Sequence, residues 1–325
     1  MSFDTIAGQE QAKRFLRNGL RNNKLSHAYI FSGPSGSGRK RMAAKLAQAV
    51  YCLEREDDAC GQCIECRKVE HGNHPDFYWV EPDGASIKIE QIRELQKGFS
   101  YKSTDSKRKI YVLNEADKMT VQAANSLLKF LEEPQSDIMA ILITENAHAL
   151  LPTIQSRAQG IPFVPMDPKV MAARLQEDGL SVTLVLPAVQ LAAGMKAARE
   201  LVEAPWFAEA RNVVVQLARE TLTRFPAALL TVQQKVIKTD LAERVPALLD
   251  LWILWFKDMI HLQVGNQDNV VYIDQRDELA RLALSKEAKF WVGGIEKIVE
   301  AQKRLRFHAN AQLALEKLLI DIQGG

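Results

Sequence analysis

Residues 28–40 have the sequence AYIFSGPSGSGRK, in which a short apolar run enters a loop with glycine at positions 33, 36 and 38. A helical pattern follows from about residue 41 to residue 52. A strand, a glycine-rich loop and a helix in this order form a cradle for phosphate groups, because the glycines let backbone amides point inward and the helix N-terminus adds positive potential. We therefore expect Gly33, Gly36 and Gly38 to shape a phosphate-binding loop.

The loop differs from a working ATP site at the positions after its last glycine. Such a site needs a lysine for the β- and γ-phosphates, followed by a hydroxyl for Mg²⁺. Here the two positions are Arg39 and Lys40. If Lys40 is instead aligned with the phosphate lysine, Arg41 takes the metal position. Neither alignment supplies a hydroxyl, and both place a cation where Mg²⁺ would sit.

The second half of the expected site also lacks a group that would hold Mg²⁺. The apolar strand pattern KIYVL at 109–113 ends at Asn114 and Glu115, where an ATPase carries Asp-Glu. Asn114 lacks the charge that helps to hold the metal, whereas Glu115 keeps a carboxylate that could orient water. We expect a degenerate site that does not hydrolyse ATP, and weak nucleotide binding through the loop amides and Arg39 stays open. An ordinary glycine turn is the simpler alternative, disfavoured because both halves occur together.

Four cysteines, at positions 52, 60, 63 and 66, lie in one segment with the spacing C-x7-C-x2-C-x2-C. Two cysteines separated by two residues can bind one Zn²⁺, and four thiolates close a tetrahedral shell with no open position. We expect Cys52, Cys60, Cys63 and Cys66 to hold a structural zinc ion in a module at 52–66. His71 and His74 are weaker candidates, because four sulfurs already fill the shell.

The chain lacks the features of a membrane or secreted protein. No stretch approaches the roughly 18 apolar residues that span a bilayer, and the first residues contain no apolar signal core. We therefore expect a cytoplasmic protein that has no membrane partner, whose thiols stay reduced, which disfavours disulfides between the cysteines.

The chain has 325 residues, of which 47% are hydrophobic and 25% charged, so it can bury the cores of several domains. A net charge of +2 is too balanced to argue for nucleic-acid binding from charge alone. Strand and helix patterns alternate over the first half, then short helices and finally long amphipathic helices follow. We expect an α/β domain at 1–165, a small helical domain at 166–204 and an all-α domain at 205–325. The expected strands are 28–31, 77–80, 109–113, 139–143 and 160–163.

Arg157 lies just before the last expected strand. A guanidinium at the edge of a domain can reach a phosphate bound by a neighbouring subunit and make two parallel hydrogen bonds to it. From spacing alone, an ordinary surface arginine at the end of a short helix is the favoured interpretation.

Five segments together resemble one known family. They are NKLSHAYIFSG at 23–33, the four cysteines, NHPDF at 73–77, EADKMTVQAANSLLKFLEEP at 115–134 and the pair Ser156-Arg157. They resemble the clamp-loader subunits of bacterial DNA polymerase III, which belong to the AAA+ proteins. The resemblance is dense over residues 1–165 and weak beyond them.

Within this family, the gamma/tau motor subunits keep Gly-Lys-Thr and Asp-Glu, whereas delta-prime subunits lack them and keep the Ser-Arg pair. The sequence therefore resembles the delta-prime type. This implies a RecA-like α/β AAA+ domain with a zinc module, a helical lid and an α-helical collar. It also implies that Arg157 is an arginine finger offered to ATP on the adjacent gamma/tau subunit. Thr144 matches a sensor position of the family, and Lys196 in the segment 194–196 matches a second one only loosely.

The resemblance further implies the partners. The chain would join gamma/tau and delta subunits in a hetero-pentamer that loads the β sliding clamp on primed DNA, as part of the DNA-directed DNA polymerase III holoenzyme. Two alternatives stay open: an active gamma/tau-like ATPase, which the missing hydroxyl and aspartate disfavour, and a zinc-containing nucleic-acid binder. Trp252 and Trp255 are better explained as core or interface residues than as a platform for stacking bases.

Overall fold

The computed structural model describes residues 2–100, 108–132 and 138–324, and omits the side chains of residues 98–100 and 130. The chain divides into two compact units, Met1–Met166 and Asp167–Gly325. The finer division of the sequence into three domains stays a prediction. No helix in the described ranges is both long and apolar enough to span a membrane.

The first unit contains a parallel five-stranded sheet with the order β2-β3-β4-β1-β5. Its strands are β1 (Ala28–Ser32), β2 (Phe77–Val80), β3 (Lys109–Leu113), β4 (Ile138–Thr144) and β5 (Gln159–Pro162). All five were predicted from the sequence to within one residue at either end. The arrangement confirms the expected α/β fold.

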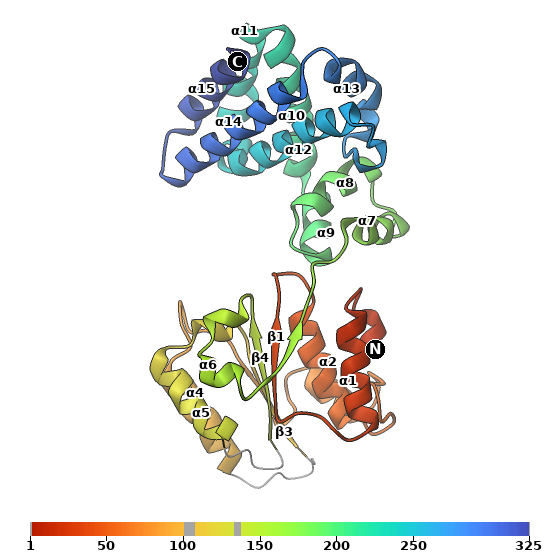
Figure 1. The fold of residues 1–325 in the computed structure, drawn as a ribbon, viewed down its shortest axis with the longest axis vertical. Helices are drawn as coiled ribbons and strands as arrows, with labels where there is room; N and C mark the ends of the chain where they lie inside the picture. The colour runs from red at the N-terminus through yellow and green to blue at the C-terminus, as the bar shows by residue number, and fades with distance from the viewer. Residues whose placement is uncertain (1, 101–107, 133–137, 325) are drawn as a thin grey trace. The chain divides into compact units, whose positions relative to one another are not determined.

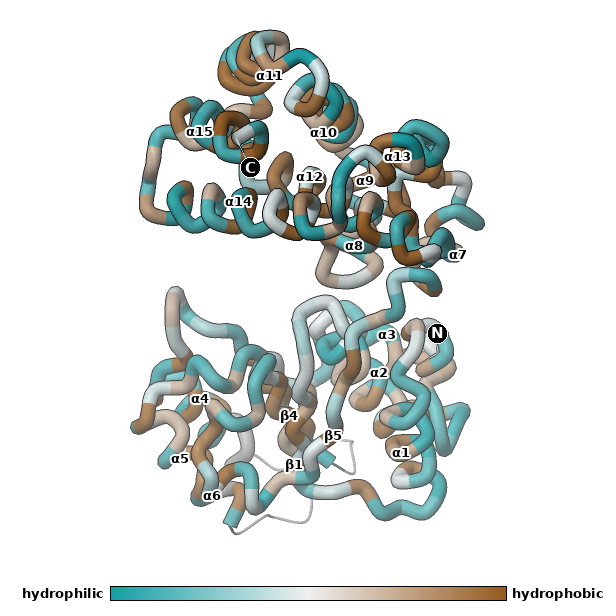
Figure 2. The backbone as a smooth tube through the Cα atoms, turned by 45° about the horizontal axis from the view of Figure 1, so that its top comes forward, coloured by the Kyte–Doolittle hydropathy of each residue, from teal (hydrophilic) through white to brown (hydrophobic). Residues whose placement is uncertain are grey.

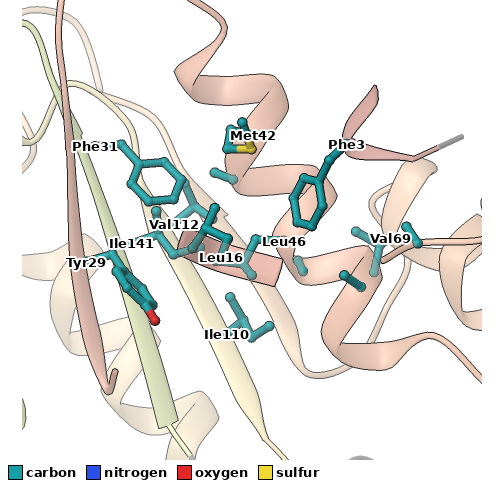
Figure 3. Packing of buried hydrophobic residues seen from close by; sticks show 14 of the residues in the cluster. Phe3, Leu16, Tyr29, Phe31, Met42, Leu46, Val69, Ile110, Val112 and Ile141 are labelled. Carbon is teal, nitrogen blue, oxygen red and sulfur yellow. The ribbon is translucent and has the colours of Figure 1, made fainter. Parts of the chain in front are cut away.

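The central strands β1, β3 and β4 are buried on both faces of the sheet, which explains why they are continuous apolar runs. The edge strands β2 and β5 are more exposed. Along β1, Tyr29 and Phe31 point into one cluster of buried residues, and Ala28 and Ile30 point into the other. Figure 3 shows Phe31 beside Met42, which lies on the helix that covers this face, with Tyr29 on the same side of the strand. In Figure 2, β4 is mostly brown, that is hydrophobic, whereas α1 alternates between brown and teal residues.

Helices cover each face of the sheet (Figure 1). On the face of Tyr29 and Phe31 lie α1 (Glu10–Arg21), α2 (Arg39–Tyr51) and α3 (Ile64–Glu70). On the other face lie α4 (Ile89–Ser100), α5 (Val121–Glu132) and α6 (Pro152–Gln155). The helix α5 follows Thr120, whose Oγ1 accepts a hydrogen bond from Ala123 N at 3.2 Å. The last two residues of its family motif, 133 and 134, lie outside the described residues.

The second unit is helical throughout its described part (Figure 1). Its α-helices are α7 (Pro168–Glu177), α8 (Val182–Leu191), α9 (Met195–Glu203), α10 (Pro205–Thr223), α11 (Phe225–Thr231), α12 (Val245–Gln263), α13 (Arg276–Ala283), α14 (Ala288–Arg306) and α15 (Ala311–Gln323). Both tryptophans of α12, Trp252 and Trp255, are fully buried, which agrees with a role in packing and excludes an exposed stacking platform.

A buried carboxylate fixes the segment after α12 to that helix. The two oxygens of Asp258 accept hydrogen bonds from Val271 N at 3.0 Å, and Oδ2 also accepts one from Tyr272 N at 2.8 Å. Burial raises the pKa of Asp258 to about 6, although these backbone donors oppose the change. Folding therefore disfavours the ionised form of Asp258, and the contribution of this residue to the free energy of unfolding depends on pH.

We expect the free energy of unfolding of the Asp258→Asn variant, relative to that of the native protein, to increase as the pH rises. Because the folded pKa is raised from 3.8, the stabilising contribution of protonated Asp258 is present below about pH 4 and is lost as the pH rises through about 6. A shift of this size corresponds to up to about 3 kcal/mol. Denaturant unfolding of both proteins at pH 4, 5, 6 and 7 measures it, and a difference that does not change with pH would contradict it.

Candidate functional site

The phosphate loop leaves the carboxyl end of β1, next to the end of β4. Gly33 N donates to Thr144 O at 3.2 Å. Gly33 has φ +151°, and a Cβ atom placed on it would lie 2.2 Å from Phe163 O. Only glycine fits this close approach of two backbone segments. Gly36 and Gly38 also have positive φ angles, 73° and 92°, as the glycine-rich pattern predicts.

Arg39 is buried at the start of α2, which begins two residues earlier than the sequence pattern indicated. Its guanidinium donates to Thr144 O, the carbonyl that also receives Gly33 N, and Nη2 lies 3.5 Å from Glu145 Oε1. Burial lowers the pKa of Arg39, and the charge of Glu145 partly offsets this change. The side chain at the phosphate-lysine position thus contacts the end of β4.

Lys40, at the position of the missing hydroxyl, is also paired within the chain. Its Nζ lies 3.5 Å from Oε1 of Glu81, which directly follows β2. Glu81 also accepts hydrogen bonds from Asn114 Nδ2 at 2.6 Å and Trp79 Nε1 at 2.7 Å. Burial alone would raise the pKa of Glu81, but the bonds from Trp79 and Asn114 together with Lys40 hold it below its ordinary value. A magnesium ion placed here would meet an ammonium group and an amide.

The remaining polar residues expected at the site also have partners. Glu115 has a positive φ of 51° and forms an ion pair with Lys118, three residues on. Thr144 is the last residue of β4, and its Oγ1 donates to Asp117 Oδ1 at 2.6 Å. The structure therefore brings Arg39, Asn114 and Thr144 to the carboxyl edge of the sheet, with their side chains bonded to other groups of the chain.

Gln9, which the sequence analysis did not single out, supports the loop from behind. It is buried, with a positive φ of 61°, and its Nε2 donates to Ser37 O at 3.0 Å and to Val164 O at 2.6 Å. Val164 N donates back to Gln9 Oε1 at 3.2 Å. One side chain thus connects the N-terminal segment, the loop and the segment that follows β5.

The four cysteines converge at the end of α2 and the start of α3. Their sulfur atoms all lie within 4.8 Å of one another. Backbone amides donate to the sulfurs, among them Cys63 N to Cys60 Sγ at 3.2 Å and Cys66 N to Cys63 Sγ at 3.5 Å. Hydrogen bonds from the amides of Cys63 and Gln62 lower the pKa of Cys60 to about 6, whereas burial raises that of Cys66. Four convergent thiols with amide donors fit a metal ion that takes thiolate ligands.

His74, the nearby histidine, is bonded within the protein. Its Nδ1 accepts a hydrogen bond from Asp76 N at 3.1 Å, and its Nε2 lies 3.2 Å from Glu65 Oε2. Its ring stacks on Tyr51 with centroids 3.8 Å apart. Among the described residues, the cluster that could hold a metal ion contains the four cysteines and neither His71 nor His74.

Arg157 lies two residues beyond α6, with 36% of its side chain exposed. Nη1 donates to Thr153 O at 3.0 Å and lies 3.4 Å from Ser156 Oγ, while Nη2 lies 3.1 Å from Glu132 Oε1. In the second unit, Lys196 is almost fully exposed and lies 3.7 Å from Glu200 on the next turn of α9.

Two family models match the chain. One described as DNA polymerase III, delta subunit, matches residues 8–167, and one described as DNA polymerase III, delta subunit, C terminal, matches residues 207–324. DNA polymerase III subunit delta' of Bacillus subtilis (strain 168) is 37% identical over 320 residues, which are 98% of this chain and 97% of that protein. The chain belongs to the delta-prime subunit family of DNA polymerase III.

Other relatives agree with this assignment. The delta-prime subunit of Pseudomonas aeruginosa is 29% identical over 312 residues and 91% of each chain. The tau subunit of Bacillus subtilis (strain 168) is 33% identical over 177 residues, which are 54% of this chain and 31% of that protein. The likeness to the delta-prime family thus extends over nearly the whole chain, whereas the likeness to tau covers about half of it.

Proposed function

We propose that the chain is the delta-prime subunit of a DNA polymerase III clamp loader and that it does not hydrolyse ATP itself. In this role it joins gamma/tau and delta subunits in a hetero-pentamer that places the β sliding clamp on primed DNA. Membership of the delta-prime family supports the assignment.

The observation that carries the non-hydrolysing role is the pairing of both loop cations within the chain. Arg39 is bonded to Thr144 O and Glu145, and Lys40 lies beside Glu81, which also binds Asn114. A hydrolysing site needs the first cation free for phosphate and a hydroxyl and carboxylate for Mg²⁺. Here the hydroxyl and the carboxylate are replaced by an amine and an amide, and an ammonium group repels a divalent cation.

The catalytic contribution of the chain is then Arg157, acting on ATP held by the adjacent gamma/tau subunit. Its guanidinium is permanently charged, partly exposed and able to make two parallel hydrogen bonds to a phosphate. The charge that develops on the transferred phosphoryl group is the feature that such an arginine stabilises.

The four cysteines would hold a structural zinc ion. With all four ligands supplied by the chain, a bound ion has no open position for substrate, so its contribution is to folding. Cys52 directly follows α2 and Cys66 lies within α3, so the ion would join the end of the helix that carries the phosphate loop to the helix α3.

Reconstitution tests the proposal. Gamma/tau and delta subunits mixed with and without this chain are compared for ATP hydrolysis and for loading of β onto primed DNA. We expect both activities to need the chain, while the chain alone hydrolyses no ATP. Full loading by the mixture that lacks the chain would refute the assignment.

Restoring the missing groups is expected to create an Mg²⁺-dependent ATP site. In the isolated chain, Arg39→Lys, Lys40→Thr and Asn114→Asp together replace a repelling amine by a hydroxyl and an amide by a carboxylate. At short range such charge changes exceed 1.4 kcal/mol, so we expect ATP affinity in the presence of Mg²⁺ to rise about tenfold or more. Calorimetric titration with and without Mg²⁺ measures the change.

The control for this experiment carries Lys40→Ala in place of Lys40→Thr, which removes the amine without supplying the hydroxyl. It should bind ATP more weakly than the restored protein when Mg²⁺ is present. Equal Mg²⁺-dependent binding by the native chain and the restored protein would show that the native loop is not impaired.

A further inference from the structure

Arg157 is held by groups from two separate elements. Glu132, the last residue of α5, contacts Nη2 at 3.1 Å, and the backbone carbonyl of Thr153 in α6 accepts from Nη1 at 3.0 Å. The two contacts use different nitrogens of one planar group. Together they restrict both the position and the tilt of the guanidinium.

The carboxylate of Glu132 is mounted on a helix that is packed against the sheet. Leu127 and Leu131 of α5 belong to the buried cluster on this face, with Ala123 and Ala124. Since α5 is anchored along its length, its last residue presents the carboxylate at a defined place.

The ion pair between Glu132 and Arg157 is not explained by folding stability, because about half of the Glu132 side chain and about a third of the Arg157 side chain are exposed, and such pairs contribute little. Its main consequence is the restraint that it places on the guanidinium of Arg157.

We propose that Glu132 is a positioning residue for Arg157, holding its guanidinium at the domain edge in the orientation needed for a triphosphate bound by the neighbouring subunit. This inference rests on the proposed function of Arg157. A free arginine side chain samples many rotamers and loses that freedom when it binds a phosphate. A guanidinium that is already restrained loses less, so the transition state forms more readily.

The test uses the complete reconstituted clamp loader with Glu132→Gln, which keeps the shape of the side chain and removes its charge. We expect kcat for ATP hydrolysis to fall about fivefold, equivalent to about 1 kcal/mol, with KM for ATP unchanged. In a loader that carries Arg157→Ala, the same substitution should lower kcat no further. The matched control is Glu94→Gln, which removes an exposed acid from α4 and should leave kcat unchanged.

The outcomes distinguish the positioning role of Glu132 from the arginine-finger role of Arg157. If Arg157→Ala slows hydrolysis but Glu132→Gln leaves kcat unchanged or raises it, the positioning role is wrong and the arginine finger stands. A loss from Glu132→Gln that persists in the Arg157→Ala background also overturns the positioning role, because it does not act through the arginine. If Arg157→Ala itself has no effect, the proposed function of Arg157 fails and the inference fails with it.

Discussion

Replacing Arg157 by alanine is expected to lower ATP turnover by the reconstituted clamp loader about a thousandfold or more, the range typical of arginine fingers. The side chain is partly exposed and its contacts lie at the surface, so the fold of this chain and the assembly of the complex should survive. The loss arises on the neighbouring subunit, where the developing charge on the phosphoryl group would lack its guanidinium.

Two controls sharpen this experiment. Arg157→Lys keeps a positive charge but loses the planar fork, and should give a loss smaller than that of alanine. Arg93→Ala removes an exposed arginine from α4 of the same unit and should leave turnover unchanged. Gel filtration verifies that each complex assembles. Normal turnover by an intact complex that carries Arg157→Ala would refute the role of this residue.

The second large effect is expected at the cysteines. We expect elemental analysis to find about one zinc per chain, and its removal by a strong chelator to unfold the segment 52–66. Apparent binding free energies of structural zinc in small peptides are about 10–16 kcal/mol at neutral pH, so this segment depends on the ion for its folding. The only helix here is α3, which starts at Ile64.

The unfolding should extend to the end of α2, because Gln48 Nε2 donates to Cys66 O at 2.8 Å. Cys60→Ser combined with Cys63→Ser should abolish zinc binding and lower the melting temperature. His71→Ala should retain the metal, since the four sulfurs form the cluster without it. A native chain that is fully folded and free of metal would overturn the zinc assignment.

The central strands of the sheet could be predicted from the sequence because they are buried on both faces. Runs such as KIYVL at 109–113 are apolar throughout, and the glycine loop after β1 set the order of elements around it. The approach of the cysteines could also be predicted, since three of the four lie within seven residues and the fourth lies eight residues before the first of them. In both cases the residues on which the prediction rests lie close together in the sequence.

The pairing of the site residues could not be predicted, because it depends on contacts between distant segments. Arg39 meets Glu145 only because β1 and β4 are neighbours in the sheet. Glu81 could have been suspected, as an acid that directly follows a strand at the edge where the loop lies. Gln9 gave no such signal, because a glutamine near the N-terminus is ordinary in any sequence. Glu132 lies within the family motif at 115–134, but nothing in that motif indicates that it pairs with Arg157.

The central claim is that this chain acts on ATP bound elsewhere, and ATP turnover by the isolated chain tests it most directly. Purified protein is incubated with saturating ATP, with and without Mg²⁺, and phosphate release is compared with a sample that lacks protein. The account predicts release at the background rate in both conditions. Turnover that depends on Mg²⁺ and is abolished by Glu115→Gln would show that the chain has a working site of its own.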